Sequence, residues 1–439
     1  MAAARRRRSV AVILFRSYRV VIAVAAIAVL GALTVHLGCG KTPPPAPPAA
    51  PPATSHAVRV RIAQDVQQVK LTATDKLRQL VARTADGKTT PLTLPPKAPV
   101  VATAAADGWQ VGSATIAGAG PLLLEADPPG ALAVEGRAYR GTFRLVRPKT
   151  GSAFDVVNHV TVDEYLKGVL SAELHAEFMP EAYKAQAVIA RTYALYTVRT
   201  TPETYHYDLH ADVRSQVYGG IRSETAKSVQ AAESTAGEVV AYGPPGQEKI
   251  FKTYYSSCCG GATISNQDVF GEPLIEPFTP KAVGPRCDIS AGPYKARFNW
   301  GPIVVSRTEL ARRMVAWGKV KNLPIAKLQG IKRLSVQQEN AAARPTQYVV
   351  EDVRGSSYVL SAEQLRLSAN YDAPEAAKLP SGFVTPVVDG SNVRFTNGRG
   401  FGHGVGMCQW CLEAQARKGV RYDAMVRDAY PGAVVLKAY

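Results

Sequence analysis

The chain has 439 residues, with 52 Lys and Arg against 35 Asp and Glu, which gives a formal net charge of +17 at pH 7. This length exceeds one small domain and allows a sizeable hydrophobic core. Basic surface of this size favours anionic polymers, acidic lipid or nucleic acid. The sequence contains no motif that combines aromatic and basic residues as nucleic-acid-binding modules do, so we expect no nucleic acid partner.

The first 39 residues form a basic N-terminus followed by an apolar run. Arginines at positions 5 to 8, with Arg16 and Arg19, precede apolar residues from 20 to 37. The positive end of such a segment stays in the cytoplasm, so the remainder is expected to be exported and held at the membrane, in the periplasm or cell envelope. The anchor is either this apolar run, as a helix, or a lipid on Cys39. Removing the six arginines lowers the formal charge from +17 to +11 for the exported part.

A Pro/Ala-rich linker is predicted for residues 40–56, and a β-rich part for residues 57–150. Seven prolines between Pro43 and Pro52 make the linker a semi-rigid polyproline spacer of about 3.1 Å per residue. Beyond it, apolar and polar residues alternate among many Gly, Pro and Thr, as at Val58 and Val60. This alternation is typical of strands joined by turns.

A helix is predicted to begin at Thr161. Thr161 and Glu164 fit a capping box, in which the hydroxyl accepts from an early amide and the glutamate reaches back to the cap. Apolar residues then recur at helical spacing, and Glu173 falls within their stripe. Apolar neighbours raise the pKa of a carboxyl toward the range that a general acid needs. A solvated or ion-paired glutamate at a helix end is the alternative.

A second helix is predicted for residues 180–199. Pro180 suits the first helical position, and small residues along one side would let this helix approach the Glu173 helix closely. Gln186 and Arg191 interrupt the Ala-rich run. Each is a candidate for hydrogen-bonding a sugar or positioning Glu173, and Arg191 is equally a candidate for a structural ion pair.

The middle of the chain contains one polar loop and one less familiar insert. The loop at 254–263 combines hydroxyls with two glycines, which suits carbohydrate as well as an ordinary turn. Its candidate substrate ligands are Ser256 and Thr263. The insert, at about 303–390, is predicted to contain a helix from 306 to 317, strands near 334 and 348–353, and a short helix after 361.

Five glycines occupy every second position from Gly398 to Gly406. In an extended strand, one face would be bare backbone and the other would carry Arg399, His403 and their neighbours. Because glycine weakens a strand, its repetition indicates that another backbone or an extended ligand lies against it. No register fits the nucleotide-binding pattern G-x-G-x-x-G.

Cysteine usage leaves disulfides and a metal site as alternatives. Besides Cys39, the chain contains Cys258, Cys259, Cys287, Cys408 and Cys411. An odd number in an exported protein indicates one or two disulfides and a spare thiol. Cys408 and Cys411 have the C-x-x-C spacing of redox motifs and of half a zinc site, which Cys258 or Cys259 and His403 could complete. No second such motif accompanies them, so disulfides are favoured and no metal or other cofactor is predicted.

Four segments together resemble the family of stage II sporulation protein D and the amidase enhancer LytB (SpoIID/LytB). They are residues 163–196, 207–219, 251–270 and 398–410. We therefore assign residues 151–439 to one SpoIID/LytB-like domain that includes the insert. His175 departs from the family by replacing a proline. His210 and Ser215 stand where some clostridial members have metal-binding cysteines, so that metal site is not carried over.

The sequence therefore predicts an α+β fold with a β-rich N-terminal part and a mixed α/β catalytic-type domain with a substrate groove. The resemblance implies a lytic transglycosylase that cleaves peptidoglycan glycan strands and leaves 1,6-anhydromuramyl ends, with Glu173 as catalytic acid. The candidate substrate-binding residues are Gln186, Arg191, Gln216, Ser256, Thr263, Arg399, His403 and Gln409. Alternatives are a non-catalytic glycan-binding protein that enhances a cell-wall amidase, and a thiol or metal enzyme built on Cys408 and Cys411.

Overall fold

The computed structural model describes residues 56–74, 78–118, 120–127, 131–147, 151–289 and 297–439. The predicted basic N-terminus and anchor lie outside these residues, as does the predicted linker apart from its last residue. Within the described ranges, no helix combines the length and the apolar character that crossing a membrane requires. Helices and several sheets both contribute to the fold, so the predicted α+β class is confirmed.

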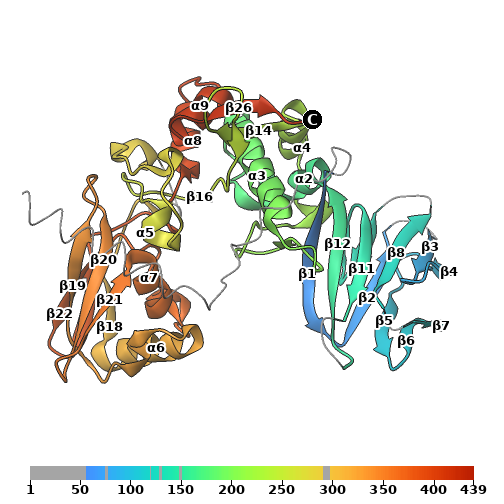
Figure 1. Ribbon diagram of the computed structural model, residues 1–439, viewed down its shortest axis with the longest axis horizontal. Helices are drawn as coiled ribbons and strands as arrows, with labels where there is room; N and C mark the ends of the chain where they lie inside the picture. The colour runs from blue at the N-terminus through green and yellow to red at the C-terminus, as the bar shows by residue number, and fades with distance from the viewer. Residues whose placement is uncertain (1–55, 75–77, 119, 128–130, 148–150, 290–296) are drawn as a thin grey trace, which may run out of the picture. The chain divides into compact units, whose positions relative to one another are not determined.

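Two sheets dominate the part before the first described helix (Figure 1). The seven-stranded sheet has the order β13-β1-β12-β11-β8-β3-β4, and the six-stranded sheet has the order β10-β9-β2-β5-β6-β7. Val58 and Val60, which the alternation placed on one face of their strand, are fully buried. The strands are β1 (Ala57–Val66), β2 (Gln68–Ala73), β3 (Arg78–Arg83), β4 (Thr89–Leu94), β5 (Val100–Ala105), β6 (Gly108–Val111), β7 (Ala114–Ala117), β8 (Leu122–Asp127), β9 (Leu132–Val134), β10 (Arg137–Tyr139), β11 (Thr142–Val146), β12 (Phe154–Thr161) and β13 (Leu209–His210).

Helix α2 (Val162–Glu173) follows β12 directly, and it begins where the sequence predicted. The Thr161 Oγ1 accepts a hydrogen bond from the Glu164 N–H, at 3.4 Å. The Glu164 carboxylate pairs with Lys167 and Arg140 instead of returning to the cap, at 2.7 and 2.9 Å. Two opposite charges attract this carboxylate more strongly than one backbone amide does, which accounts for the difference from the predicted capping box.

Helix α3 (Pro180–Thr200) is almost entirely buried along its first sixteen residues. Small residues allow it to pack against α2, α4 (Ala226–Ser234) and β14 (Glu238–Tyr242). Its start is capped from the far end of the chain, because the Met179 N–H donates to the fully buried Glu413 carboxylate, at 2.8 Å. Negative charge at a helix N-terminus is stabilising, so this bond fastens the C-terminal helix α8 (Gln409–Ala416) to α3.

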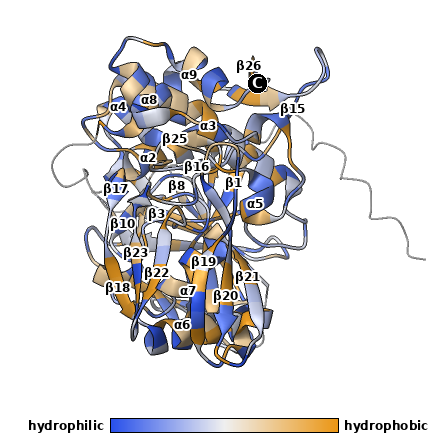
Figure 2. Cartoon of the chain, turned by 90° about the vertical axis from the view of Figure 1, so that its left-hand side faces the viewer, coloured by the Kyte–Doolittle hydropathy of each residue, from blue (hydrophilic) through white to orange (hydrophobic). Residues whose placement is uncertain are grey.

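The insert contains two three-stranded sheets and two longer helices. Ser306 caps α6 (Arg307–Lys321), which runs four residues beyond the predicted end, and α7 (Ala362–Asn370) follows Ser361 as predicted. The strands of the insert contain both hydrophobic and hydrophilic residues (Figure 2), and along β20 buried positions alternate with partly exposed ones. The strands are β18 (Ile303–Ser306), β19 (Ile331–Glu339), β20 (Pro345–Asp352), β21 (Ser357–Ser361), β22 (Thr385–Asp389) and β23 (Asn392–Thr396).

Short strands and turns complete the C-terminal part. β14 pairs with β15 and β26, β16 is parallel to β25, and β17 pairs with β24. These elements are β15 (Lys249–Ile250), β16 (Tyr255–Ser256), β17 (Asn299–Trp300), β24 (Gly398–Arg399), β25 (Met407–Cys408), β26 (Val434–Lys437), α5 (Asn266–Phe270) and α9 (Tyr422–Ala429), with 3-10 turns η1 (Gly220–Ser223), η2 (Glu276–Phe278), η3 (Gly284–Cys287), η5 (Pro324–Lys327) and η6 (Glu375–Ala377).

The glycine-rich segment is not the regular strand that its alternation suggested. Gly400, Gly402, Gly404 and Gly406 all have positive φ, between 67° and 93°. A left-handed residue at every second position reverses the pleat, so only the two ends of the segment pair as strands. The expected close approach does occur, because Cβ atoms at Gly400 and Gly406 would collide with the carbonyls of Cys258 and Tyr254. The neighbouring element is therefore the protein's own backbone.

The buried guanidinium of Arg344 crosslinks this region. Arg344 is 1% exposed and donates to the carbonyl oxygens of Cys259, Ala262 and His403, at 2.7 to 3.0 Å. Three carbonyl partners compensate a buried charge that would otherwise be costly. Arg344 precedes β20, so it joins the insert to both the 254–263 loop and the glycine-rich segment.

We predict that Gly404→Ala destabilises the protein far more than Gly419→Ala. Both glycines have positive φ, which costs an alanine about 1 kcal/mol. A Cβ at Gly404 would also collide with the Arg344 guanidinium, whereas a Cβ at Gly419 meets no atom within 4 Å. We expect the free energy of unfolding, measured by urea titration, to fall by about 3 kcal/mol for Gly404→Ala and about 1 kcal/mol for Gly419→Ala. Equal losses would contradict the packing described.

Candidate functional site

Glu173 is the last residue of α2, and its carboxyl is held by three donors. The Val217 N–H donates to Glu173 Oε1 at 2.7 Å, and the side chains of Tyr255 and Gln409 also hydrogen-bond this carboxyl. Burial raises the pKa of Glu173 above its usual value, and the three hydrogen bonds, which favour the charged form, offset part of that increase. The residue as a whole keeps partial exposure.

A directed chain of hydrogen bonds lies behind the Glu173 carboxyl. The Tyr165 hydroxyl donates to Gln216 Oε1 at 3.3 Å, and Gln216 Nε2 donates to the Tyr255 hydroxyl at 3.2 Å. Since the Tyr255 oxygen accepts from Gln216, its own proton is free to donate to Glu173. Burial raises the pKa of Tyr165 and of Tyr255 well above the usual value, so both hydroxyls keep their protons.

Gln216 and Gln409, two predicted substrate ligands, thus converge on Glu173 in different ways. Gln216 is fully buried and reaches Glu173 through Tyr255, so it is a positioning residue and not a direct sugar ligand. Gln409 starts α8 and bonds the carboxyl itself. Tyr255 is not among the site residues that the sequence predicted. The pair Tyr254 and Tyr255 was a usable signal, because adjacent residues of a strand point to opposite faces.

Aromatic rings and the cation Arg297 lie near the turn that follows α2. The His175 ring lies 5.3 Å from the Trp410 ring, between centroids. Burial lowers the pKa of His175, and the nearby Arg297 guanidinium lowers it further. Arg297 donates to the Ser257 hydroxyl at 2.8 Å and lies 4.7 Å from the ring centroid of Phe401, which is 41% exposed. An exposed ring beside a guanidinium suits a sugar that carries a carboxylate. No sequence pattern indicated Arg297.

Arg191 and Gln186 of α3 are placed in the interior. Arg191 is fully buried and pairs with Asp163 at 2.8 Å, while it also donates to the carbonyl oxygens of Ala232 and Glu238. It is therefore the structural ion pair that the sequence left open, and not a sugar ligand. Gln186 is fully buried, and neither of its amide atoms has a hydrogen-bond partner among the described residues. Burial excludes it from direct contact with a polymeric substrate in this conformation.

The other four predicted ligands lie in the 254–263 loop and the glycine-rich segment. Thr263 Oγ1 accepts from the Lys281 N–H at 2.9 Å, and the buried Ser256 Oγ has no partner among the described residues. The Arg399 guanidinium lies 4.8 Å from the centroid of the Phe383 ring. His403 Nδ1 accepts from the Val405 N–H at 3.0 Å, and burial lowers the pKa of His403 to about 4. His403 is therefore neutral at pH 7.

Other acids considered from the sequence are unsuited to act with Glu173. Glu177 is exposed on the turn after α2. Asp212 is exposed and forms a bidentate pair with Arg214, at 2.7 Å for the shorter contact. This hydrogen bonding lowers the pKa of Asp212 to about 2, so it stays ionised and occupied by its partner.

A separate pocket of about 590 Å³ lies in the insert, between α6 and the start of β19. Its lining combines apolar side chains with the cations Arg307, Arg312 and Lys319. None of the residues that the sequence analysis singled out lines it, so the pocket is not part of the Glu173 site.

We predict that Glu173→Gln changes how stability depends on pH. A carboxyl whose pKa is raised by folding contributes stability below the usual value of 4.5, and this contribution is lost as pH rises through the folded pKa. Wild type should therefore lose stability relative to Glu173→Gln between pH 4 and pH 7, measured by urea unfolding. Glu177→Gln, at an exposed position, is the control. Parallel curves for wild type and Glu173→Gln would contradict desolvation of this carboxyl.

A family model covers part of this site. Residues 150–242 match the family model of SpoIID, stage II sporulation protein, and this range includes Glu173, Val217 and Gln216. Tyr255 and Gln409 lie beyond it. An uncharacterised protein of Brachyspira hyodysenteriae is 27% identical over 278 residues, which are 63% of this chain and 67% of that protein.

Two relatives with descriptive names come from Bacillus subtilis. Stage II sporulation protein D is 24% identical over 305 residues, which cover 66% of this chain and 79% of that protein. The amidase enhancer is 26% identical over 336 residues, which cover 69% of this chain but only 44% of the enhancer, so the chain spans less than half of that relative. Residues 150–242 therefore match a SpoIID domain, and the predicted resemblance to the SpoIID/LytB family is confirmed.

Proposed function

We propose that this chain cleaves the glycan strands of peptidoglycan as a lytic transglycosylase, with Glu173 as the acid. A cell-wall role is supported by the SpoIID domain and by the names of the relatives. The observation that carries the enzymatic proposal is the Glu173 carboxyl at the end of α2, whose pKa burial raises and whose position the Val217 N–H fixes. A carboxyl with these properties holds its proton to higher pH than an exposed glutamate does, and it can deliver that proton to a bound ligand.

In the proposed reaction, one carboxyl acts twice. Protonated Glu173 gives its proton to the glycosidic oxygen, and the bond from that oxygen to the muramyl C1 breaks. The resulting carboxylate then takes the proton of the muramyl C6 hydroxyl as this oxygen bonds to C1. The product is a 1,6-anhydro ring, no water is consumed, and Glu173 ends protonated as it began.

The surroundings of Glu173 support both protonation states. Burial favours the neutral acid before bond cleavage, and the donors Val217 N–H, Tyr255 and Gln409 stabilise the carboxylate that follows. Hydrolysis of the usual kind needs a second, suitably placed carboxyl. Asp212 and Glu177, the two acids nearest in the matched motifs, are respectively bound to Arg214 and exposed, which favours the reaction that needs one carboxyl.

The proposed substrate fits the charges of the chain. Lactyl and peptide carboxylates make the wall polymer anionic, and the exported part has a formal charge of +11 once the six N-terminal arginines are removed from +17. Arg297 beside Phe401 is the proposed contact for one such carboxylate. Export and membrane anchoring by the residues before the linker belong to the proposal, because such a substrate lies outside the cytoplasm.

The direct test is mass spectrometry of purified glycan strands incubated with the protein. New 1,6-anhydromuramyl ends are expected with wild type and with Glu177→Gln, and none with Glu173→Gln, while circular dichroism shows all three folded. Reducing ends would instead mean hydrolysis and would require a second carboxylate. The absence of any cleavage by folded wild type, on strands with and without stem peptides, would overturn the enzymatic proposal.

We predict a second kinetic signature for Tyr255→Phe. This change removes a donor that stabilises the Glu173 carboxylate, so the pKa of Glu173 should rise further. The rate of a general acid falls above its pKa, hence the alkaline limb of the pH–rate profile should move to higher pH. The maximal rate should fall about tenfold or more, because Gln216 Nε2 also loses the Tyr255 hydroxyl as its acceptor. An unshifted profile with a lower rate would mean that Tyr255 has only a structural role.

One observation favours a second function, because the similarity to the amidase enhancer extends over 69% of this chain. In that reading, the protein binds glycan and stimulates a cell-wall amidase without cutting the strand. Amidase stimulation that survives in Glu173→Gln, together with the absence of anhydro ends from wild type, would favour this reading.

A further inference from the structure

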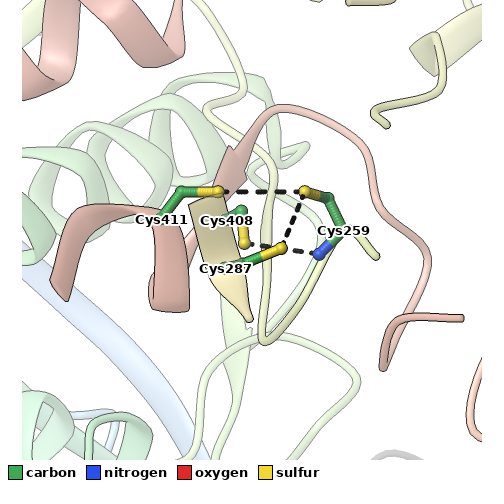
Figure 3. Close-up of side chains that lie close together, drawn as sticks. All are labelled: Cys259, Cys287, Cys408 and Cys411. Atoms are coloured by element: carbon green, nitrogen blue, oxygen red, sulfur yellow. Dashed lines mark hydrogen bonds between the residues drawn. The ribbon is translucent and has the colours of Figure 1, made fainter. Parts of the chain in front are cut away.

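Four cysteines from three distant segments meet in the interior, apart from the Glu173 carboxyl. They are Cys259 in the loop after β16, Cys287 at the end of η3, and Cys408 and Cys411 at the start of α8. All four side chains are buried, and their sulfur atoms lie within 4.8 Å of one another. Figure 3 shows the sulfurs directed toward a common centre. Two of the four come from the C-x-x-C motif, whereas Cys287 had not been connected with it.

We infer that this cluster is a structural Zn²⁺ site with four thiolate ligands. Zinc bound to four cysteines is tetrahedral, with Zn–S bonds of about 2.3 Å, and the sulfurs of such a tetrahedron lie about 3.8 Å apart. The Cys259 sulfur lies 3.6 Å from that of Cys287 and 3.9 Å from that of Cys411. These separations match the edge of the tetrahedron.

The same distances distinguish zinc from other uses of cysteine. A disulfide places two sulfurs about 2.05 Å apart, and all five described cysteines are free, so the favoured disulfides are not present in this structure. A four-iron cluster binds each cysteine to a different iron, which requires its sulfurs to stand apart around the whole cluster. Four sulfurs that all lie within 4.8 Å of one another can surround a single ion. Zinc is the common ion for four thiolates without redox chemistry.

The surroundings stabilise negative charge on the sulfurs. The Cys259 N–H donates to Cys408 Sγ at 3.3 Å, a bond of the kind that supports metal-bound thiolates. A small cavity lined by Cys259, Cys408 and Cys411 is also lined by Lys281 and Arg286. Four thiolates and Zn²⁺ together carry two negative charges. The cavity is also lined by Asp428, which pairs with both cations, so these three side chains leave one positive charge to balance part of the charge of the cluster.

Local structure also explains how the ligands come together. Cys408 is the N-cap residue of α8 and Cys411 lies in its first turn, where the helix dipole favours thiolates. The loop that carries Cys259 is held by the Arg344 guanidinium, which donates to the Cys259 carbonyl at 2.9 Å. Cys258 is also buried, and its side chain contacts those of Cys287 and Cys408. Its sulfur does not belong to the group of four whose sulfur atoms all lie within 4.8 Å of one another.

The site fastens the donors of Glu173. Gln409, which bonds the Glu173 carboxyl, lies between the ligands Cys408 and Cys411, and Tyr255 lies on β16, which is paired with β25. A metal bound by these cysteines would join the 254–263 loop, η3 and α8, which are up to 152 residues apart in sequence. Such a constraint stabilises a fold. None of the four ligands lies in the 207–219 segment, where His210 and Ser215 had ruled out a metal site.

The test is metal analysis of the purified full-length chain. We expect about one zinc per chain by inductively coupled plasma mass spectrometry, and Co²⁺ in its place should give the intense visible bands and thiolate charge-transfer absorption of tetrahedral sulfur coordination. Cys259→Ser and Cys411→Ser should each lose most of the metal. Cys258→Ser, which removes the adjacent buried cysteine, should retain it.

Several results would overturn the inference. These are folded wild type without zinc that also fails to bind added Zn²⁺ or Co²⁺, disulfides among the four cysteines by mass spectrometry of the unreduced protein, or iron with acid-labile sulfide. Metal content and spectra are measured without substrate, so they do not depend on the proposed transglycosylase. Zinc without cleavage would remove the enzymatic proposal alone, and cleavage without zinc would remove this inference alone.

Discussion

The close contact between two backbones, residues 400–406 and residues 254–264, is the constraint on which the C-terminal part depends. Side chains at Gly400 or Gly406 would collide with carbonyls of the opposite segment, so the contact is possible only without Cβ atoms. The two backbones exchange hydrogen bonds, as between the Cys258 N–H and the Phe401 carbonyl at 3.1 Å. This contact brings α8 to the end of α2, and it brings the C-x-x-C motif to Cys259.

Charge in the interior is compensated by fixed partners throughout this region. Arg344 is held by three carbonyls, Arg191 by Asp163, and Glu413 both by Arg417 and by the Met179 N–H that begins α3. Such groups add little net stability over apolar packing, but each has one arrangement that satisfies it. Glu173 differs from them, because it receives hydrogen bonds without a cationic partner among the described residues and keeps partial exposure. That difference is what sets it apart as a candidate for chemistry.

The two sites share their supporting elements. Tyr255 lies on β16, and Cys408 lies on β25, the strand that is paired with it. Gln409 follows Cys408 directly and precedes Cys411. Both side-chain donors to Glu173 are therefore close to the cysteine cluster along the backbone: Gln409 is the neighbour of Cys408, and Tyr255 pairs with the residue before Cys408. A rigid support of this kind reduces the reorganisation that a catalytic group would need during a reaction.

Local features of the fold could be predicted from neighbouring residues along the chain. Thr161 as a helix cap, Pro180 as a helix start and the apolar stripe around Glu173 follow from the chemistry of neighbouring residues, and α2 and α3 confirm them. Four matched segments sufficed to indicate the SpoIID/LytB family. Alternation also indicated the strands at Val58, because side-chain direction in a strand depends on position alone.

Only the tertiary structure decided which distant residues meet. The sequence left Arg191 as either a sugar ligand or an ion-pair partner, and its contact with Asp163 identifies the ion pair. Gln216 is connected to Glu173 through the Tyr255 hydroxyl. Cys287 joined Cys408 and Cys411 across more than a hundred residues, a pairing that no spacing rule contains. The glycine alternation predicted a strand, but the left-handed turns depend on the backbone packed against it. Periodicity and capping act within a few residues, whereas these contacts arise from packing between segments that the sequence keeps far apart.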